Sequence, residues 1–408
     1  MTRYFDDLET RSADARAAAL ARELPAQIRR AQQKAPRLAE MLAGIDAGRI
    51  TTVDDLAALP VLRKSDLGKA QGADAPFGGL TTRPAAAFEH IFQSPGPIYE
   101  PGRTTRDWWR IGRFLHACGI GAGDIVQNCF SYHMTPAGMI FESGARTVGA
   151  SVFPAGTGQT ELQVRAAHDI GATAYAGTPD YLKVILDRAD SMGVDLSSIK
   201  RAGVGGGALF PSLRAEYADR GIQCLQNYAT ADLGNIAYES PAMEGMIVDE
   251  HVIVEIVTPG TGETVKPGEV GEVVVTTLNP DYPLIRFATG DLSAVLPGIS
   301  PCGRTNMRIK GWMGRADQTT KIKGMFVRPE QVAALVASHD AILKARVIAS
   351  RADEKDVMTV QIESGNADAA GFEKAVVETL KLRANVIVVE PGSLPNDGKV
   401  IDDQRSYD

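Results

Sequence analysis

Apolar positions divide the chain into stretches of different periodicity. In the first eighty residues, Leu20, Leu24 and Ile28 recur every four residues between Pro and Gly breaks. This spacing predicts a helical cover, in which Pro25 ends or kinks the first helix. From Asp124 onward, short apolar and β-branched runs alternate with helical segments, a pattern typical of parallel strands joined by helices.

The alternation predicts one open sheet. Expected strands are Ile125 to Phe130, Val148 to Phe153, Ala172 to Ala176, Arg201 to Val204 and Ile222 to Asn227. The helical segments between them carry Thr or Pro at the beginning and Gly at the end, which are the usual boundary signals of helices. We therefore expect an α/β fold with a doubly wound sheet, which binds ligands beyond the carboxyl ends of its strands.

The second half of the chain changes character. Helical periodicity disappears, and the runs His251 to Val257, Glu272 to Thr277 and Leu284 to Ala288 predict antiparallel strands of a β subdomain. After them, the order strand, helix, two strands, helix, strand predicts a small α+β domain. We therefore expect an N-terminal domain at 1–316 and a C-terminal domain at 317–408.

The composition argues against several classes of protein. The chain has 408 residues, of which 44% are hydrophobic and 23% charged, as is typical of soluble globular proteins. A net charge of −7 argues against a nucleic-acid-binding surface. The start MTRYFDDLETRS is acidic where a signal peptide is basic, and no apolar run approaches the length of a membrane span. We expect a cytoplasmic protein with no nucleic-acid or membrane partner; the sequence leaves open whether it forms a homodimer.

The first candidate for chemistry follows the expected strand that ends at Asn227. It reads Tyr228-Ala-Thr-Ala-Asp232. An aromatic ring can stack on a purine, the hydroxyl of Thr230 can bond a phosphate, and a carboxylate can hold Mg²⁺. The alternative is a polar turn that closes a strand.

Two Gly-containing turns are further candidates. Gly205, Gly206 and Gly207 follow a strand, and the missing Cβ atoms would let a flat cofactor approach the backbone. Asp291 follows a Gly in the run Arg-Phe-Ala-Thr-Gly-Asp, where its carboxylate can accept hydrogen bonds from both hydroxyls of a ribose. Ordinary tight turns explain both segments as well.

Two charged segments complete the set. Arg315 and Asp317 stand at the expected domain boundary, where an arginine can reach phosphates and an aspartate can serve as a pivot. Lys399 follows a Gly turn and can offer a positive charge to a developing phosphate anion. The alternatives are a linker that is charged to stay solvated and a lysine that faces solvent.

Taken in this order and at these separations, the five motifs resemble those of the adenylate-forming acyl-CoA synthetase superfamily, and within it the phenylacetate-CoA ligase family. Gly-Gln-Thr-Glu-Leu-Gln at 158–163, Thr-Pro-Asp-Tyr-Leu at 178–182 and Cys-Gly-Arg-Thr at 302–305 also look like that family's versions. The resemblance runs from about residue 124 to residue 399. It implies the adenylate-forming enzyme fold, in which a large N-terminal domain binds the adenylate and a small, mobile C-terminal lid domain swings about a hinge.

The resemblance also implies a role for each matching residue. In the motif after the strand, Tyr228 would stack on adenine, Thr230 would contact the α-phosphate, and Asp232 would stand where the family has a metal-binding glutamate. Asp291 would hold the ribose hydroxyls, and Arg315 would reach the nucleotide. Asp317 would be the hinge, and Lys399 would stabilise the adenylation transition state.

The implied reaction has two halves. A carboxylate attacks the α-phosphorus of Mg²⁺-bound ATP to give acyl-AMP and pyrophosphate, and the thiolate of coenzyme A then attacks the acyl carbon and expels AMP. The protein mainly positions charges, because the mixed anhydride is itself the activated species. The resemblance favours phenylacetate or a similar aromatic acid. Two alternatives are a catalytically weakened relative that binds a nucleotide or acyl-CoA, and an adenylating enzyme with another acceptor.

The phosphate loop departs from the family pattern. The segment reads Phe-Gln-Ser-Pro-Gly-Pro-Ile-Tyr-Glu over residues 92–100, so only Ser94 and Gly96 can cradle a phosphate. Its two prolines remove backbone N–H donors, and it has no lysine. Glu100 would repel a triphosphate if it pointed inward.

The acid would lie beside the segment after the first strand of the sheet. Tyr132, His133 and Met134 should line one wall of this pocket and suit an aromatic or medium-sized apolar acid. His133 is a candidate for contact with the carboxylate; the alternative is a hydrogen-bonded histidine of the core or rim.

Overall fold

The computed structural model describes residues 3–94, 96–207, 209, 211–313, 316, 320–322, 325–327, 329–339, 341–352, 355–366, 369–395 and 400–405. The chain forms two compact units. The larger consists of Met1–Gly268, Val273–Thr289 and Ala294–Gly311, and the smaller of Glu269–Glu272, Gly290–Ser293 and Trp312–Asp408. Among the described residues, no helix combines the length and hydropathy needed to span a bilayer.

In the described part of the larger unit, nine strands form one sheet in the order β14-β15-β10-β9-β8-β7-β6-β4-β5. Its parallel part consists of β4 (Ile125–Asn128), β5 (Ser151–Phe153), β6 (Ala174–Gly177), β7 (Arg201–Val204) and β8 (Gln223–Thr230). The antiparallel part consists of β9 (Gly234–Tyr238), β10 (Met246–Val248), β14 (Val295–Leu296) and β15 (Arg308–Ile309). The doubly wound sheet predicted from the sequence is therefore confirmed.

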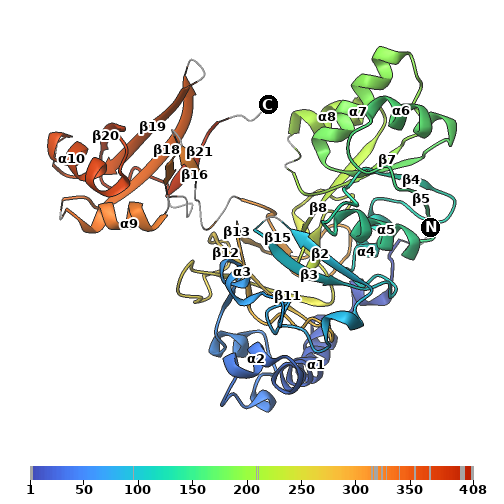
Figure 1. Cartoon of the computed structure of the whole chain (residues 1–408), viewed down its shortest axis with the longest axis horizontal. Coiled ribbons are helices and arrows are strands. Elements are labelled where there is room, and N and C mark those ends of the chain that lie inside the picture. Colours follow the sequence, from blue (N-terminus) through green and yellow to red (C-terminus); the bar gives the residue numbers. More distant parts are fainter. Residues whose placement is uncertain are drawn as a thin grey trace. The chain divides into compact units, whose positions relative to one another are not determined.

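Helices cover both faces of the parallel strands (Figure 1). They are α4 (Gly112–Ala117), α5 (Ala137–Thr147), α6 (Thr160–Asp169), α7 (Pro179–Met192) and α8 (Pro211–Asp219). Strand β6 shows why. Ala174 and Ala176 belong to the apolar cluster of α4 and α5, whereas Tyr175 between them belongs to the cluster of α6, α7 and α8. Because successive side chains of a strand point to opposite faces, a strand buried on both sides is apolar throughout.

The β subdomain contains a second sheet in the order β1-β13-β12-β11. Its strands are β1 (Leu62–Arg63), β11 (Val252–Val257), β12 (Gly271–Thr277) and β13 (Phe287–Ser293). The strand expected from Leu284 begins three residues later, because Arg286 has a φ of 47° and leaves extended geometry. Its buried guanidinium forms an ion pair with Glu255 at 3.0 Å and donates to Leu59 O at 2.7 Å.

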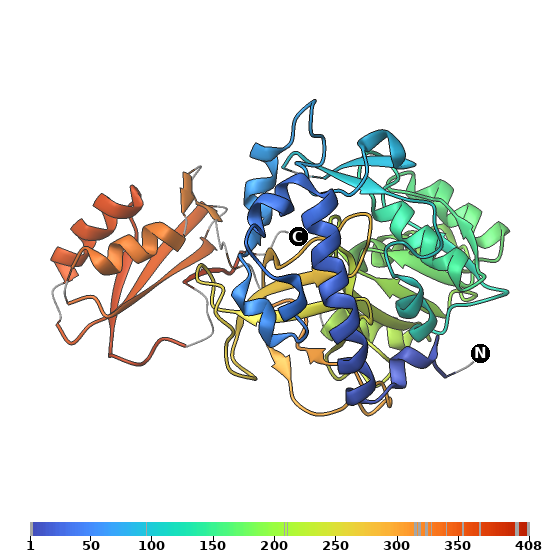
Figure 2. The same ribbon diagram turned by 90° about the horizontal axis from the view of Figure 1, so that it is seen from below.

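The N-terminal segment contains α1 (Ala13–Lys34), α2 (Pro36–Met41), α3 (Leu67–Ala70) and the antiparallel hairpin of β2 (His90–Ser94) and β3 (Ile98–Gly102). The 3₁₀ helices are η1 (Asp7–Thr10), η2 (Ala47–Arg49), η3 (Asp54–Ala58), η4 (Lys64–Asp66) and η5 (Ala85–Ala87). Helix α1 continues through Pro25, contrary to the expected break (Figure 2). Leu24 and Ile28 on either side of the proline are buried against the strands of the second sheet, and this packing holds the helix together.

The smaller unit has its own sheet in the order β20-β19-β18-β21 and its own apolar core. Its elements are β16 (Thr320–Ile322), β17 (Met325–Val327), α9 (Pro329–Ala337), β18 (Lys344–Ala352), β19 (Lys355–Glu363), α10 (Ala369–Leu380), β20 (Asn385–Val389) and β21 (Ile401–Asp403). The expected α+β pattern is present, and β21 is a strand that the sequence did not predict. Val347 in β18 pairs with Ile401 in β21, which fixes the C-terminal segment to the sheet.

Gly144 in α5 lies where this helix packs most tightly. A Cβ atom there would come 1.8 Å from Cγ2 of Ile111. We expect Gly144→Ala to destabilise the protein by about 1–3 kcal/mol because a stiff β-branched side chain must be displaced. Thermal unfolding measures the change, with Arg146→Ala at an exposed position of the same helix as the control. An unchanged melting temperature for Gly144→Ala would contradict this packing.

Candidate functional site

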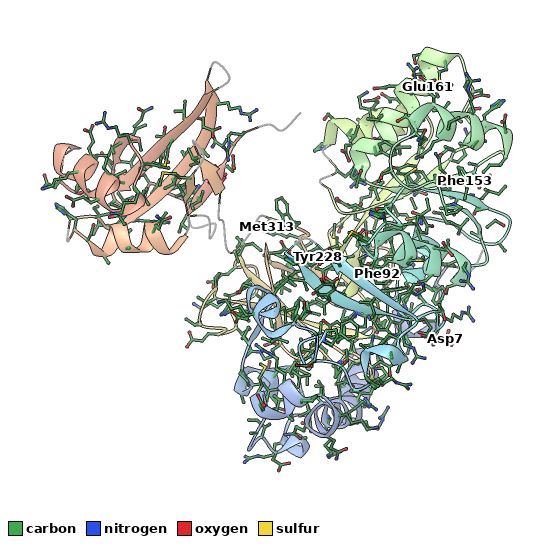
Figure 3. All side chains as sticks on the ribbon, viewed as in Figure 1. Asp7, Phe92, Phe153, Glu161, Tyr228 and Met313 are labelled. Atoms are coloured by element: carbon green, nitrogen blue, oxygen red, sulfur yellow. The ribbon has the colours of Figure 1, made fainter. Side chains whose placement is uncertain are left out.

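Tyr228 is anchored near the carboxyl end of β8. Its hydroxyl donates to the hydroxyl oxygen of Thr289 at 3.1 Å, and the residue is 7% exposed. Figure 3 labels its side chain in the larger unit. Ile98 of the β2–β3 hairpin belongs to the same apolar cluster. A ring held by both packing and a hydrogen bond is well oriented; its expected stacking on adenine stays a prediction.

Thr230 is the last residue of β8, and Asp232 lies in the turn that follows it. The hydroxyl of Thr230 accepts a hydrogen bond from the Leu233 N–H at 3.1 Å, so this residue does shape the turn. A hydroxyl that accepts one bond still has a proton to donate. Its expected contact with a phosphate is therefore compatible with the turn that was its alternative.

Asp232 is paired with a residue that the sequence did not single out. Its Oδ2 lies 2.5 Å from Nζ of Lys64, which is 168 residues away at the start of η4. The Asp232 side chain is fully buried, whereas that of Lys64 is 26% exposed. Oδ1 of Asp232 has no hydrogen-bond partner among the described residues. No local motif marks Lys64, because only the fold brings it to Asp232.

The β2–β3 hairpin contains the expected phosphate loop. The hydroxyl of Ser94 donates to Oε1 of Glu100, whose side chain is buried, and Oε2 of Glu100 has no hydrogen-bond partner among the described residues. Glu100 thus points inward, the orientation that would repel a triphosphate if the carboxyl were ionised. A Cβ atom at Gly96 would lie 2.8 Å from Cγ1 of Ile98, so the turn requires glycine there. The phosphate contacts expected for Ser94 and Gly96 stay predictions.

Burial, together with the negative charge of Asp232, raises the pKa of Glu100 to about 8. The Ser94 hydrogen bond and the Lys64 charge act in the opposite direction. Tyr282 belongs to the same group, since burial, Asp232 and Glu100 all raise the pKa of its hydroxyl. We call Lys64, Ser94, Glu100, Asp232 and Tyr282 the Glu100 cluster.

The three glycines after β7 form a tight turn. Gly206 has a φ of 70°, and a Cβ atom at Gly205 would lie 2.3 Å from Oδ1 of Asn227. At Gly207 a Cβ atom would lie 3.3 Å from Cδ of Pro179. Backbone conformation therefore favours glycine at position 206, and close packing against the Asn227 side chain favours it at position 205. Cofactor binding by this turn stays a prediction.

The remaining nucleotide residues belong to the smaller unit. Asp291 is buried in β13, and its Oδ1 accepts a hydrogen bond from Nε1 of Trp312 at 3.1 Å. This carboxylate can therefore accept bonds from a donor such as a ribose hydroxyl. Arg315, Asp317 and Lys399 lie outside the described residues, and their roles stay predictions.

The expected acid-binding segment is only partly buried. The hydroxyl of Tyr132 accepts a hydrogen bond from Nδ2 of Asn128 at 2.8 Å, and burial raises its pKa. Its ring lies against Gly138, where a Cβ atom would come within 2.8 Å. His133 and Met134 are exposed, Met134 by 52%. Tyr132 is held in place by these contacts, and its role as a wall of the acid pocket stays a prediction, as do the roles of His133 and Met134.

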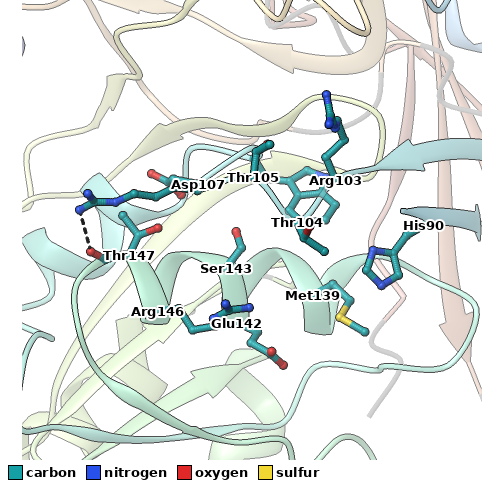
Figure 4. Close-up of a pocket in the computed structure, with 12 residues that line it drawn as sticks. His90, Arg103, Thr104, Thr105, Asp107, Met139, Glu142, Ser143, Arg146 and Thr147 are labelled. Carbon is teal, nitrogen blue, oxygen red and sulfur yellow. Dashed lines mark hydrogen bonds between the residues drawn. The ribbon is translucent and has the colours of Figure 1, made fainter. Parts of the chain in front are cut away.

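A cavity of about 300 Å³ is lined by none of the predicted residues (Figure 4). It lies between α5 and the segment 103–107, and Nη2 of Arg106 donates across it to Thr147 O at 3.2 Å. Burial raises the pKa of Asp107, another lining residue, to about 6. The residues present do not identify a ligand for this cavity.

Glu100→Gln tests the electrostatics of the cluster. The unfolded chain loses this proton near pH 4.5, whereas the folded chain keeps it until about pH 8. Wild-type stability must therefore fall as pH rises through that window, and the glutamine variant avoids the loss. We expect the variant to be more stable by about 4 kcal/mol at pH 8 and equal at pH 4, measured by thermal unfolding with EDTA.

Glu40→Gln, at an exposed position of α2, is the matched control for the same charge change. It should leave the stability nearly unchanged at both pH values. A glutamine variant of Glu100 that is equally or less stable at pH 8 would show that this carboxyl is ionised in the folded protein.

Comparisons with known proteins agree with the geometry. The family model for AMP-binding enzymes matches residues 109–279. The phenylacetate-coenzyme A ligase of Aromatoleum evansii is 28% identical over 377 residues, covering 88% of this chain and 84% of the relative. The phenylacetate-coenzyme A ligase of Escherichia coli (strain K12) is 27% identical over 426 residues, covering 97% of this chain and 96% of the relative.

Solved structures show the same architecture. An open conformation of 2-hydroxyisobutyryl-CoA ligase in complex with 2-HIB-AMP and CoA matches with a TM-score of 0.74 at 23% identity, covering 97% of this chain and 92% of that one. The same ligase in its thioesterification state matches with a TM-score of 0.73, covering 99% and 93%. The chain therefore has the adenylate-forming enzyme fold expected from the sequence.

Proposed function

Because the chain is a relative of the phenylacetate-coenzyme A ligases and carries an AMP-binding enzyme domain, we propose that it is an ATP-dependent carboxylate-coenzyme A ligase acting through an acyl-AMP intermediate. One observation carries most weight. The phosphate hairpin and the turn after β8, which the resemblance assigns to the same nucleotide phosphates, both contact the segment that follows β1: Lys64 pairs with Asp232 at 2.5 Å, and Gln71 exchanges hydrogen bonds with the backbone of Tyr99 next to Glu100. Their convergence supports a phosphate site at the carboxyl end of β8.

Several of the described residues can be given roles in the first half-reaction. Tyr228, fixed by Thr289, would carry the adenine, and the hydroxyl of Thr230 would donate to the α-phosphate. Lys64 would supply the positive charge that the phosphate loop lacks, since its side chain is 26% exposed and its ammonium reaches the buried Asp232. Fixed donors and charges of this kind stabilise the charge that develops on the phosphate.

Mg²⁺ fits the residues present. The unpartnered Oδ1 of Asp232 is a buried anionic oxygen, the kind of ligand that this ion prefers. When bound, the ion would neutralise part of the charge of the triphosphate. Asp232 is one methylene shorter than the glutamate that the resemblance leads us to expect.

The smaller unit would complete the reaction. Asp291 would hold the ribose, Arg315 would reach the nucleotide, and Lys399 would stabilise the transition state as the acid's carboxylate attacks the α-phosphorus and pyrophosphate leaves. Movement about Asp317 would then admit coenzyme A, whose thiolate attacks the acyl carbon and releases AMP. We take domains 1–316 and 317–408 as the moving parts. A cytoplasmic location and a homodimer stay predictions.

The acid is the finer part of the proposal. Its support is the name shared by the curated relatives and the half-buried aromatic wall at Tyr132. We propose phenylacetate or a similar aromatic acid.

A specific observation favours one second candidate. Ser94 donates to Glu100 and Lys64 pairs with Asp232, so these groups are already engaged within the protein. A relative that binds AMP or acyl-CoA but no longer activates an acid would show such an arrangement.

Exchange of labelled pyrophosphate into ATP separates the two candidates. A ligase catalyses this exchange only when its acid is present, because the exchange reverses acyl-AMP formation. We expect exchange with aryl acids such as phenylacetate and less with short-chain acids, followed by thioester formation when coenzyme A is added. Binding of AMP without exchange for any acid of the panel would favour the second candidate, and exchange without thioester formation would mean another acceptor.

Lys399→Ala should slow acyl-AMP formation by about 10²-fold or more, as expected on losing a donor to the transition state. Thioester formation from supplied acyl-AMP should stay largely intact, because this half-reaction needs no charge at the α-phosphorus. Lys374→Ala, at an exposed lysine of the same unit, should change neither half-reaction. Equal losses in both half-reactions for Lys399→Ala would contradict its assigned role.

A further inference from the structure

The Glu100 cluster contains two buried carboxylate oxygens that lack hydrogen-bond partners. They are Oε2 of Glu100 and Oδ1 of Asp232, and neither has a partner among the described residues. Glu100 is 0% exposed, and the side chain of Asp232 is fully buried as well. An unpaired buried polar atom is costly, and a charged one more so. Such atoms indicate a ligand that is positively charged or that donates hydrogen bonds.

Tyr282 gives independent support for a ligand near Glu100 and Asp232. It is 1% exposed, and its hydroxyl has no hydrogen-bond partner among the described residues. Burial, and after it the charges of Asp232 and Glu100, raise the pKa of this hydroxyl. Gln71, seven residues after Lys64, exchanges two hydrogen bonds of 2.8 Å with the backbone of Tyr99, the neighbour of Glu100, so the segment of Lys64 lies beside the hairpin. Ile98 and Leu233 belong to the same buried apolar cluster as Tyr282. A polar ligand in these buried surroundings would therefore interact strongly with the few polar atoms present.

The position of Lys64 indicates that the site at Glu100 and Asp232 favours a positive charge. Its ammonium lies 2.5 Å from the buried Asp232, at the end of a flexible side chain that is 26% exposed. It comes from a different segment than either carboxylate, and its position costs side-chain entropy. A cation tethered in this way can withdraw when another cation arrives.

We propose that Glu100 and Asp232 jointly bind one divalent cation, and that the ammonium of Lys64 occupies this position in the nucleotide-free protein. The phosphate hairpin thus contributes a metal-binding carboxylate where a lysine was expected. The described residues contain no group of three or more His, Cys, Asp or Glu suited to a metal ion. Mg²⁺ commonly binds through one or two carboxylates and completes its octahedron with water and substrate phosphates. For those phosphates the inference rests on the proposed function.

On this arrangement the three charged groups act in sequence. Binding of the metal ion releases the proton of Glu100 to water, the ion offsets the two negative charges that burial disfavours, and Lys64 becomes available to the phosphates. Ser94, whose hydroxyl holds one oxygen of Glu100, keeps the carboxylate oriented and acts as a positioning residue.

Binding of Mn²⁺, followed by the paramagnetic resonance of the free ion, tests the proposal without nucleotide, acid or coenzyme A. Wild-type protein should bind one ion per chain. Glu100→Gln should weaken binding by about tenfold or more, as for the loss of a supporting group at a metal site. Lys64→Met should strengthen binding, because it removes the competing cation. Glu40→Gln should bind like the wild type, and circular dichroism checks that each variant is folded.

Glu100→Gln should weaken Mn²⁺ binding and Lys64→Met should strengthen it, and this difference separates metal binding from a structural role of the cluster. Weaker binding in both variants would mean that the ion pair merely holds the fold together, and equal binding by wild type and Glu100→Gln would remove Glu100 from the site. Should Glu100→Gln fail to fold, stronger binding by Lys64→Met still supports a shared cation position, and unchanged binding overturns it. Binding of pyrophosphate without metal, lost in Glu100→Gln, would overturn the proposal in favour of an anion site.

Failure of this inference is distinguishable from failure of the proposed function. Acid-dependent pyrophosphate exchange with normal Mn²⁺ binding in Glu100→Gln would leave a ligase whose metal ion is held elsewhere. The expected Mn²⁺ pattern without any exchange would leave a metal site in a protein that does not activate acids.

Discussion

The ion pair between Lys64 and Asp232 is the constraint on which the ligand end of the sheet depends. It joins the N-terminal segment to the turn after β8, across 168 residues of sequence. A buried carboxylate without a countercharge is strongly destabilising, so Asp232 can be buried only while a cation faces it. Glu100, beside it, avoids the same problem by keeping its proton. The hairpin, the turn and the helical cover are therefore held together by charge balance as well as by apolar packing.

Much of the architecture could be predicted from periodicity. Strands such as β6 are apolar throughout because both faces are covered, and the helices between them carry clear boundary residues. The errors have local physical causes. Arg286 reads as part of a strand, yet its positive φ and its ion pair with Glu255 delay β13. Pro25 reads as a break, yet the buried residues around it hold α1 together. Neither the ion pair of Arg286 nor the packing around Pro25 can be recognised from the local sequence pattern.

The candidate site was predictable to a smaller extent. Tyr228, Thr230 and Asp232 form a recognisable motif, and the structure places them together at the end of β8. Lys64 and Tyr282 carry no such signal, because their importance comes only from what the fold brings next to them. The sequence also left the direction of Glu100 undecided, since a residue of a hairpin strand can face either side. Tertiary packing decides these cases.

The Glu100 cluster also bears on how the protein acquires its active form. Its members come from residues 64, 94, 100, 232 and 282, and its ion pair joins residues 168 positions apart in the sequence. The parallel strands β4 to β8 are complete once residue 230 has been synthesised, well before Tyr282 leaves the ribosome. Contacts of long sequence separation form slowly. During synthesis the central sheet can therefore assemble with a carboxylate still in water, and its final burial waits for a segment made fifty residues later.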